Sequence, residues 1–142
     1  MVPGNHAGTR SDAVSLTENR FIVLGRAGLD LYPDPLGTRI EDAIIFTAAL
    51  GGSSGNIAAG LARMGSEVSL LTRVSDDAVG RYTRAECKRY GIETDYCFLE
   101  TSEARNTLAL SETRTDDTQT VIYRNNAADF ALNEDDISKV DW

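Results

Sequence analysis

A pair of glycines between an apolar run and an amphipathic segment constrains this chain more than any other feature. Residues 43–50 are almost entirely apolar, Gly51 and Gly52 follow, and a short loop of small residues leads to Asn56. Because glycine has no Cβ, another group can lie directly against the backbone at such a turn. The N–H groups at the start of a helix point into the same space and favour oxygen-rich or anionic ligands. The pattern therefore predicts a floor for a small polar molecule.

Length and charge restrict the kinds of partner that this chain can have. Its 142 residues suffice for one modest domain, and 42% of them are hydrophobic, enough for a core. The formal net charge of −8 argues against nucleic acid or an anionic membrane as a partner. No apolar run approaches the roughly 20 residues of a membrane-spanning helix. We therefore expect a small-molecule ligand, no nucleic acid and no membrane.

The amino-terminal residues and the cysteines point to a cytoplasmic protein. Residues 1–20 are polar and lack the apolar core of a signal peptide, so we expect a flexible leader. Cys87 and Cys97 are the only cysteines, and neither belongs to a metal-type pair. Two cysteines are too few for a disulfide scaffold, which favours free thiols in a reducing compartment. We expect no metal site.

Hydrophobic patterning predicts a mixed series of strands and helices. We expect strands at residues 21–24, 29–32, 43–49, 68–72, 94–99, 106–111 and 120–124. Pro33 and Pro35 should end the second of these. Asn56 should cap a helix that ends at Gly65 and buries Ile57, Leu61 and Met64. Asp76 or Asp77 should cap a second helix that ends at Tyr90 and Gly91, and Asn133 a third.

The order of these elements predicts an α/β architecture. The strand–helix–strand–helix–strand rhythm of residues 43–99 is typical of a parallel sheet covered by helices. The hairpin of residues 106–124 and the proline-interrupted early strands do not fit that layer, and should form a small separate sheet that acts as a cover. Trp142 falls where a third helix should lead to another strand, so we expect a fragment of a larger domain.

A nucleophile elbow is one interpretation of the glycine loop. Residues 51–55 satisfy the pattern G-x-S-x-G between a strand and a helix. This design needs a histidine after Ser53, and the only histidine, His6, lies upstream in the leader. The interpretation is therefore weak, and it stays open only because a fragment can lack its partner residues.

Nucleotide-binding loops are a second interpretation, and the sequence excludes them. Neither G-x-G-x-x-G nor G-x-x-x-x-G-K-[ST] occurs. The two lysines, Lys88 and Lys139, are far from the glycine pair along the chain.

A sugar floor is the third and favoured interpretation. Asp30 follows Gly25 by five residues, and its carboxylate can accept hydrogen bonds from two neighbouring hydroxyl groups. The Asn56 amide can both donate and accept hydrogen bonds. Ligand sites of open α/β sheets lie at the carboxyl ends of the strands, where both residues should be.

The residues of this floor resemble the ribokinase-like sugar kinases, also called the pfkB family. The matching positions are Gly25 to Asp30, Gly51, Gly52, Asn56 to Ala58, Gly65, Asp76, Asp77 and Gly80. The resemblance runs from Phe21 to Trp142 and implies a three-layer α/β/α parallel sheet, incomplete here, with a small β lid. Residues 21–142 would be the N-terminal half of the kinase domain. Two positions depart from the family pattern, because Ser54 and Ser75 stand where other small residues are usual.

Within the family, several runs resemble the 5-dehydro-2-deoxygluconokinase subfamily of myo-inositol breakdown. They are residues 25–33, 71–74, 105–109 and 123–129. The pair Tyr123 and Arg124 also resembles the 2-keto-3-deoxygluconate kinases, so that subfamily is an alternative.

The resemblance implies a carbohydrate kinase that moves the γ-phosphoryl group of ATP, with Mg²⁺, to a sugar hydroxyl. It implies that Asp30, Gly51, Gly52 and Asn56 hold the sugar, and that Arg124, beside Tyr123, contacts it from the lid. Family members carry the catalytic base and nucleotide site in their second half, so both are expected beyond Trp142. The chain alone would bind neither ATP nor Mg²⁺ and would be inactive. A homodimer through the lid, or a non-catalytic sugar-binding remnant, is the remaining alternative.

Overall fold

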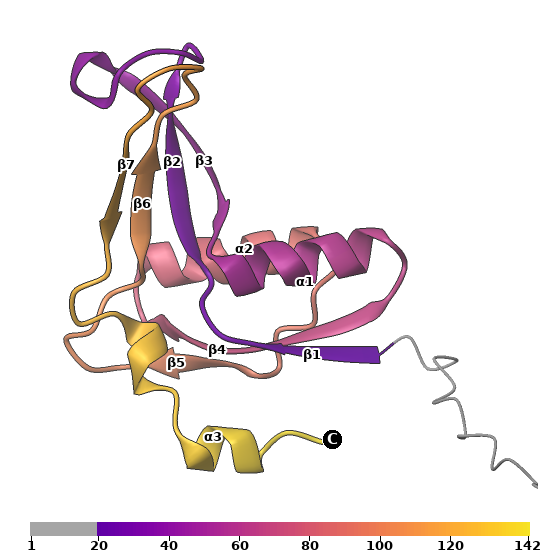
Figure 1. Ribbon diagram of the computed structural model, residues 1–142. Coiled ribbons are helices and arrows are strands. Elements are labelled where there is room, and N and C mark those ends of the chain that lie inside the picture. The colour runs from indigo at the N-terminus through magenta and orange to yellow at the C-terminus, as the bar shows by residue number, and fades with distance from the viewer. Residues whose placement is uncertain (1–19) are drawn as a thin grey trace, which may run out of the picture.

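Two sheets make up the described part of the chain. The computed structural model describes residues 20–142, so His6 and the leader predicted for residues 1–20 lie outside it, except Arg20. A parallel sheet has the order β1-β4-β5, with β1 at Arg20–Leu24, β4 at Glu67–Ser75 and β5 at Cys97–Glu100. A second sheet, the lid, has the order β3-β2-β6-β7 and comprises β2 (Gly28–Asp34), β3 (Ile45–Gly51), β6 (Leu108–Ser111) and β7 (Thr120–Tyr123). The lid rises from one end of the parallel sheet (Figure 1).

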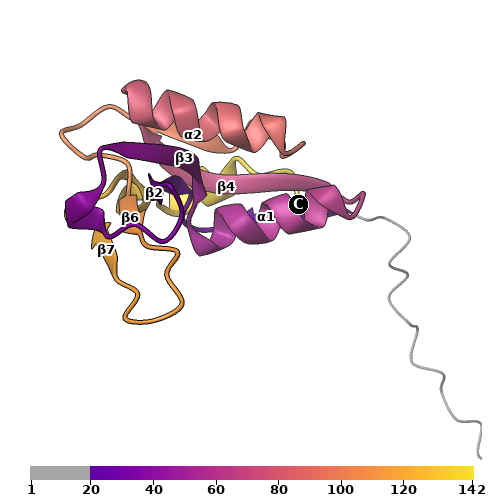
Figure 2. The ribbon, with the colours of Figure 1, turned by 90° about the horizontal axis from the view of Figure 1, so that it is seen from above.

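Helices cover both faces of the parallel sheet. The helices are α1 (Ser53–Arg63), α2 (Ala78–Arg89) and α3 (Glu134–Ser138), with short 3-10 turns η1 (Ile40–Asp42) and η2 (Ala128–Ala131). Figure 1 shows α1 and α2 over one face and α3 beneath the other, and Figure 2 shows β4 running between α1 and α2 as seen from above. Successive right-handed crossovers in one direction, β1 to β4 to β5, place their helices on the same face. The predicted three-layer α/β/α fold with a β lid is confirmed.

The core lies between the parallel sheet and the helices α1 and α2. Val68 and Leu70 lie two residues apart on β4, on the face that packs against the helices, and both are fully buried. They meet small or thiol side chains from the helices, from strand β5 and from the loop before β2, namely Ala27, Ala58, Ala59, Cys87 and Cys97. Burying each Val or Leu contributes about 1.5–3 kcal/mol. None of the helices within residues 20–142 is long and apolar enough to cross a bilayer.

Sheet membership differs from the sequence expectation in two strands. The strand predicted at residues 43–49 was assigned to the parallel layer, but β3, which covers Ile45–Gly51, pairs antiparallel with β2 in the lid. Conversely, β1 was grouped with the early lid strands, but it pairs in parallel with β4. The order of apolar segments in residues 43–99 shows that a strand precedes a helix, but it does not show to which of the two sheets that strand belongs. The chain in fact makes its crossover from β1 to β4 by way of β2, β3 and α1.

The first helix begins earlier than predicted and buries another face. Its N-cap is Gly52, with φ of 88°, and Asn56 is already helical because its N–H donates to the Gly52 carbonyl at 2.9 Å. The buried face consists of small residues, Gly55, Ala58 and Ala59. Two of the three residues predicted to be buried, Ile57 and Met64, are instead 57% and 76% exposed. The small residues pack this face of the helix against the loop before β2, where a Cβ on Gly55 would be in ordinary van der Waals contact, 3.5 Å from the Ala27 Cβ.

The predicted caps of the second and third helices and the predicted hairpin are confirmed, whereas the end predicted for the second strand is wrong. Asp77 caps α2, and the helix ends before Gly91, whose φ is 83°. Asn133 caps α3 in a reciprocal capping box with Asp136. β6 and β7 form the antiparallel hairpin. Pro33 does not end β2, which continues to Asp34; β6 pairs only as far as Leu31, so only β3 flanks this proline.

Candidate functional site

The Asp30 carboxylate lies directly against the backbone of Gly51. Across the lid sheet, Asp30 is opposite Ala49 on β3 and Ala109 on β6, so small side chains surround it. A Cβ on Gly51 would come within 2.0 Å of Asp30 Oδ1. Only glycine leaves this space open, because real Cβ atoms are not found that close to another heavy atom. The predicted proximity of Asp30 to the glycine pair is therefore present in the fold.

Gly52 makes the turn from the lid into α1. It adopts a left-handed φ of 88°, and a Cβ there would lie 2.5 Å from the Arg26 carbonyl oxygen. No side chain caps the helix that follows. Asn56 stands in the first turn with its side chain exposed, and it makes no side-chain hydrogen bond within the described residues. An uncapped helix start and a free amide thus lie beside the floor that Gly51 forms.

Burial and two neighbours set the ionisation of Asp30. Desolvation by burial raises the pKa of the Asp30 carboxyl, and a hydrogen bond from Tyr32 and the charge of Arg26 oppose that rise. The Tyr32 hydroxyl donates to Asp30 Oδ2 at 3.3 Å. The pKa of Tyr32 is raised in turn, by burial and by the charge of Asp30. Sequence reasoning missed Tyr32, although its position two residues after Asp30 on one strand places both on one face.

Arg124 lies at the base of the β6–β7 hairpin and is held by its neighbours. Its Nη2 donates to Asp129 Oδ2, and its guanidinium carbon lies 4.3 Å from the centre of the Phe130 ring. Asp129 also accepts a hydrogen bond from the Thr107 hydroxyl at 2.9 Å. Sequence reasoning included Asp129 in a family-like run and assigned it no role.

Strand alternation relates Arg124 to the face of the lid that carries Asp30. Asp30 pairs with Ala109, which pairs with Ile122 on β7, so all three share a face. Arg124 directly follows β7, which ends at Tyr123, and stands two positions after Ile122, so strand alternation continued by one residue would return it to that face. Strands lie about 4.8 Å apart with a rise of about 3.3 Å per residue, which separates the α-carbons of Asp30 and Arg124 by about 12 Å.

Tyr123 does not join this arrangement. It pairs with Leu108, which pairs with Leu29, so its side chain belongs to the opposite, apolar face of the lid. It is 60% exposed there. Of the six residues predicted to hold a sugar, the fold brings Asp30, Gly51, Gly52 and Asn56 to one end of the sheet, adds Arg124 from across the lid, and directs Tyr123 away.

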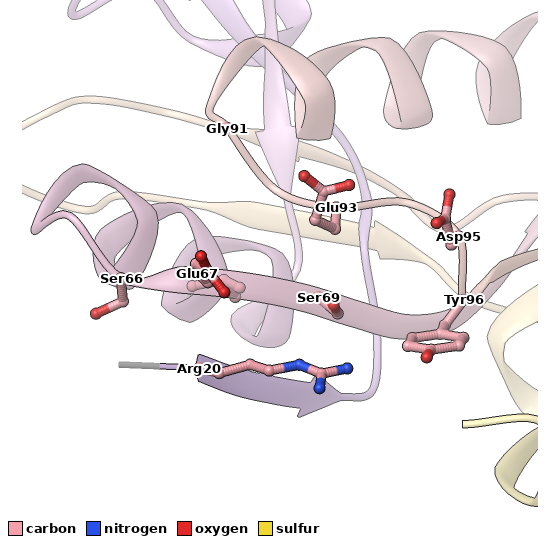
Figure 3. Close-up of a pocket in the computed structure, with 9 residues that line it drawn as sticks. Arg20, Ser66, Glu67, Ser69, Gly91, Glu93, Asp95 and Tyr96 are labelled. Carbon is pink, nitrogen blue, oxygen red and sulfur yellow. The ribbon is translucent and has the colours of Figure 1, made fainter. Parts of the chain in front are cut away.

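A separate hollow of the described surface lies away from this site. A cavity of about 460 Å³ lies at the amino ends of β1 and β4, lined by Arg20, Ser66, Glu67, Ser69, Glu93, Asp95 and Tyr96 among others (Figure 3). The predicted sugar floor lies at the opposite, carboxyl ends of the strands. Ligands of open α/β sheets bind at the carboxyl ends. The glycine turn, and not this hollow, is therefore the candidate site.

Other chemistries find less support among residues 20–142. No histidine is present there to act on Ser53, and the Ser54 hydroxyl is already engaged, donating to the Leu24 carbonyl at 3.2 Å. No cluster of three or more His, Cys, Asp or Glu side chains in this part could hold a metal ion. Residues 20–142 thus contain no site built from protein side chains alone that could hold Mg²⁺.

Comparison with known proteins assigns the family. A sequence profile described as "pfkB family carbohydrate kinase" matches residues 19–142. The chain belongs to the pfkB family of carbohydrate kinases. One pfkB relative, 5-dehydro-2-deoxygluconokinase of Photobacterium profundum, is 37% identical over 116 residues, which is 82% of this chain and 35% of the relative.

Solved structures of pfkB kinases have the same fold. A 2-dehydro-3-deoxygluconokinase from Thermotoga maritima superimposes with a TM-score of 0.75 at 24% identity, covering 82% of this chain and 36% of that one. A fructokinase from Xylella fastidiosa with bound ATP gives a TM-score of 0.70 at 25% identity, covering 84% and 34%. The pfkB segment described here thus spans little more than a third of the length of the relatives that it matches.

Proposed function

We propose that this segment supplies the sugar floor and lid of a kinase that transfers the γ-phosphoryl group of ATP to a hydroxyl of a sugar acid. The observation that carries the proposal is the shared face of Asp30 and Arg124, with Gly51 clearing space for the carboxylate. A carboxylate accepts hydrogen bonds from sugar hydroxyls, and a guanidinium pairs with an acid group. The pair therefore suits a ligand with hydroxyls at one end and a carboxylate at the other.

We propose 5-dehydro-2-deoxy-D-gluconate, an acid of myo-inositol catabolism, as the substrate. The relative named 5-dehydro-2-deoxygluconokinase supports this choice of substrate. The alternative is that the protein is a 2-keto-3-deoxygluconate kinase. The same Asp30–Arg124 arrangement supports this alternative, because 2-keto-3-deoxygluconate is also a sugar acid. The Xylella neighbour with bound ATP supports ATP as the phosphoryl donor. The free, buried thiols of Cys87 and Cys97 suit the cytoplasm as the location.

In this proposal the described residues bind, orient and shield the sugar. Asp30 and Asn56 take hydroxyl groups, Gly51 and Gly52 let the sugar approach the backbone, and Arg124 takes the acid group. The lid strands exclude water from the bound sugar, which protects a phosphoryl group from hydrolysis. Positioning and charge stabilisation carry most of such a transfer.

The test uses the native protein, meaning the protein as its source cells produce it, with its intact mass measured first. Phosphorylation with ATP and Mg²⁺ is followed for the two sugar acids and for fructose. Asp30→Asn should raise the dissociation constant for the sugar roughly 10- to 100-fold, because a hydrogen bond to a charged group is lost. Unchanged sugar affinity in that variant would contradict the floor. A native mass equal to this chain would instead favour a sugar-binding remnant.

We also propose that the apolar face of the lid binds a second copy. Alternation along the four strands gathers Leu29, Leu31, Phe46, Leu108, Leu110, Val121 and Tyr123 on the face opposite Asp30. Val121 and Tyr123 are 39% and 60% exposed. A two-fold contact places the same face on both copies, which suits an apolar surface. Light scattering of the native protein should give a dimer, and Val121→Glu a monomer; a wild-type monomer would contradict the proposal.

A further inference from the structure

Asp129 is buried at the base of the lid, with both carboxylate oxygens engaged. Its side chain is 6% exposed, and it accepts hydrogen bonds from the Thr107 hydroxyl and from Arg124 Nη2. The turn that carries it is itself fixed, because the Ala128 N–H donates to the Arg105 carbonyl at 2.9 Å. Asp129 therefore joins the start of β6 to the end of β7 from a rigid position.

The guanidinium of Arg124 is held on one edge and one face. Asp129 holds one terminal nitrogen, and the ring of Phe130 stacks on the plane. The other terminal nitrogen, Nη1, makes no hydrogen bond within residues 20–142, and the side chain is 41% exposed. Because a guanidinium can serve two carboxylates through different nitrogens, this side chain retains a free edge for a second acid group.

We propose that Asp129 is a positioning residue that, through Arg124, gives the site its preference for substrates with a carboxylate. The proposal rests on the proposed function, since it concerns the same sugar site. A free arginine side chain loses much rotamer freedom when it binds a ligand. Asp129 and Phe130 restrict the side chain before the ligand arrives, so less freedom is lost on binding. A neutral sugar has no carboxylate to pair with Arg124, so its affinity does not benefit from the restricted side chain.

The test compares two substrates on the native protein. One is the sugar acid, and the other is its uncharged counterpart, in which a hydroxymethyl group replaces the carboxylate. Asp129→Asn should raise KM for the acid about tenfold, with kcat unchanged, and leave KM for the neutral sugar within twofold. Asp129→Glu keeps the charge and should recover part of the loss. Asp116→Asn, in the exposed Arg114–Asp116 pair of the lid turn, is the matched control and should change neither KM.

A second variant keeps the test informative if Asp129→Asn does not fold. Thr107→Val removes the other hydrogen bond to Asp129 and leaves its pair with Arg124. It should raise KM for the acid severalfold and spare the neutral sugar. In an Arg124→Gln background, Asp129→Asn should then have no further effect on the ratio of the two KM values.

Three outcomes would overturn the inference. The two KM values could rise together in Asp129→Asn, which would indicate a purely structural role. The acid preference could stay unchanged in a well-folded Asp129→Asn or Thr107→Val protein. The effects of Asp129→Asn and Arg124→Gln could be additive. If the wild-type protein phosphorylates no sugar acid, the proposed function fails, and this inference fails with it. If the wild-type protein prefers the sugar acid and the variants keep that preference, only this inference fails.

Discussion

Asp30 illustrates the conflict between binding and stability at a single residue. Burial raises the pKa of its carboxyl above the ordinary value, so the ionised form is less favourable in the folded chain than in the unfolded one. The carboxylate therefore lowers stability at neutral pH, and that loss is relieved as the pH falls through the raised pKa. The sugar contact that we propose for Asp30 gives a reason for a carboxylate at this position, whereas packing gives none.

Replacing this carboxylate should stabilise the native protein while weakening its sugar binding. We expect Asp30→Asn to melt at the same temperature as wild type or higher at pH 7, with the difference shrinking toward pH 4. Thermal unfolding at several pH values checks this. Asp77→Ala is the opposing control, because Asp77 caps α2 and its loss should cost about 1 kcal/mol. A marked fall in the melting temperature of Asp30→Asn would contradict the account.

Tyr32 should tune the pH range in which Asp30 works. Its hydrogen bond favours the ionised carboxylate, so Tyr32→Phe should raise the pKa of Asp30 further. Sugar affinity falls as Asp30 becomes protonated, so the acid limb of the affinity profile should move to higher pH in Tyr32→Phe. Titration of sugar binding by calorimetry from pH 4 to 8 measures the limb. Tyr82→Phe, on α2, should leave the profile in place.

At the scale of elements, Arg73 fastens α3 beneath the parallel sheet. From β4 it donates to Asp136 at 2.7 Å and to Glu100 at 2.9 Å, and the Asp136 side chain is fully buried. Hydrogen bonding to Arg73 lowers the pKa of Asp136, against the opposing effect of burial. The stabilisation is therefore complete at neutral pH and is lost as the pH falls below about 3.9, through the lowered folded pKa.

Asp136→Ala should destabilise the native protein by about 2–3 kcal/mol. A fully buried pair that loses one partner costs about 3–5 kcal/mol, and the 19% exposure of the Arg73 side chain reduces that figure. Urea denaturation at pH 7 gives the free energy of unfolding. Lys139→Ala removes the exposed partner of Asp136, 3.6 Å away, and should cost less than about 0.5 kcal/mol. Equal losses in the two variants would refute the importance of the buried contact.

The positions of helices and strands could be predicted from the sequence more readily than the faces that they bury. Asp77 and Asn133 were expected as caps because short polar side chains satisfy helix N–H groups, a purely local interaction. The prediction of the buried face of α1 was wrong. The helix has one stripe of large apolar side chains, with Ile57 and Met64, and another of small side chains, with Ala58 and Ala59. Which stripe is buried depends on how close the helix lies to the sheet, a tertiary property that periodicity does not contain.

At the scale of the whole molecule, the pairing of strands was the part that sequence reasoning could not supply. β1 and β3 both precede turns at glycine, yet one belongs to the parallel sheet and the other to the lid. The site has the same origin. Asp30 and the glycine pair were recognised from residue type, while Tyr32 and Asp129 matter through the side chains that they contact. The contacts of Asp129 with Thr107 and Arg124 depend on how the η2 turn packs against the base of the lid, which no local pattern fixes.

The last prediction concerns the 142-residue chain purified by itself, which should bind sugar weakly and transfer no phosphoryl group. It contains the floor and the lid, but it spans only about a third of its pfkB relatives. Large apolar side chains are also exposed on β1 and α1, with Leu24 at 52% and Ile57 at 57%, so the isolated chain should self-associate. ADP release with ATP, Mg²⁺ and the sugar acid measures transfer, and light scattering measures association. Sugar-dependent ADP release by this polypeptide would mean that a catalytic base and an ATP site lie within its own residues.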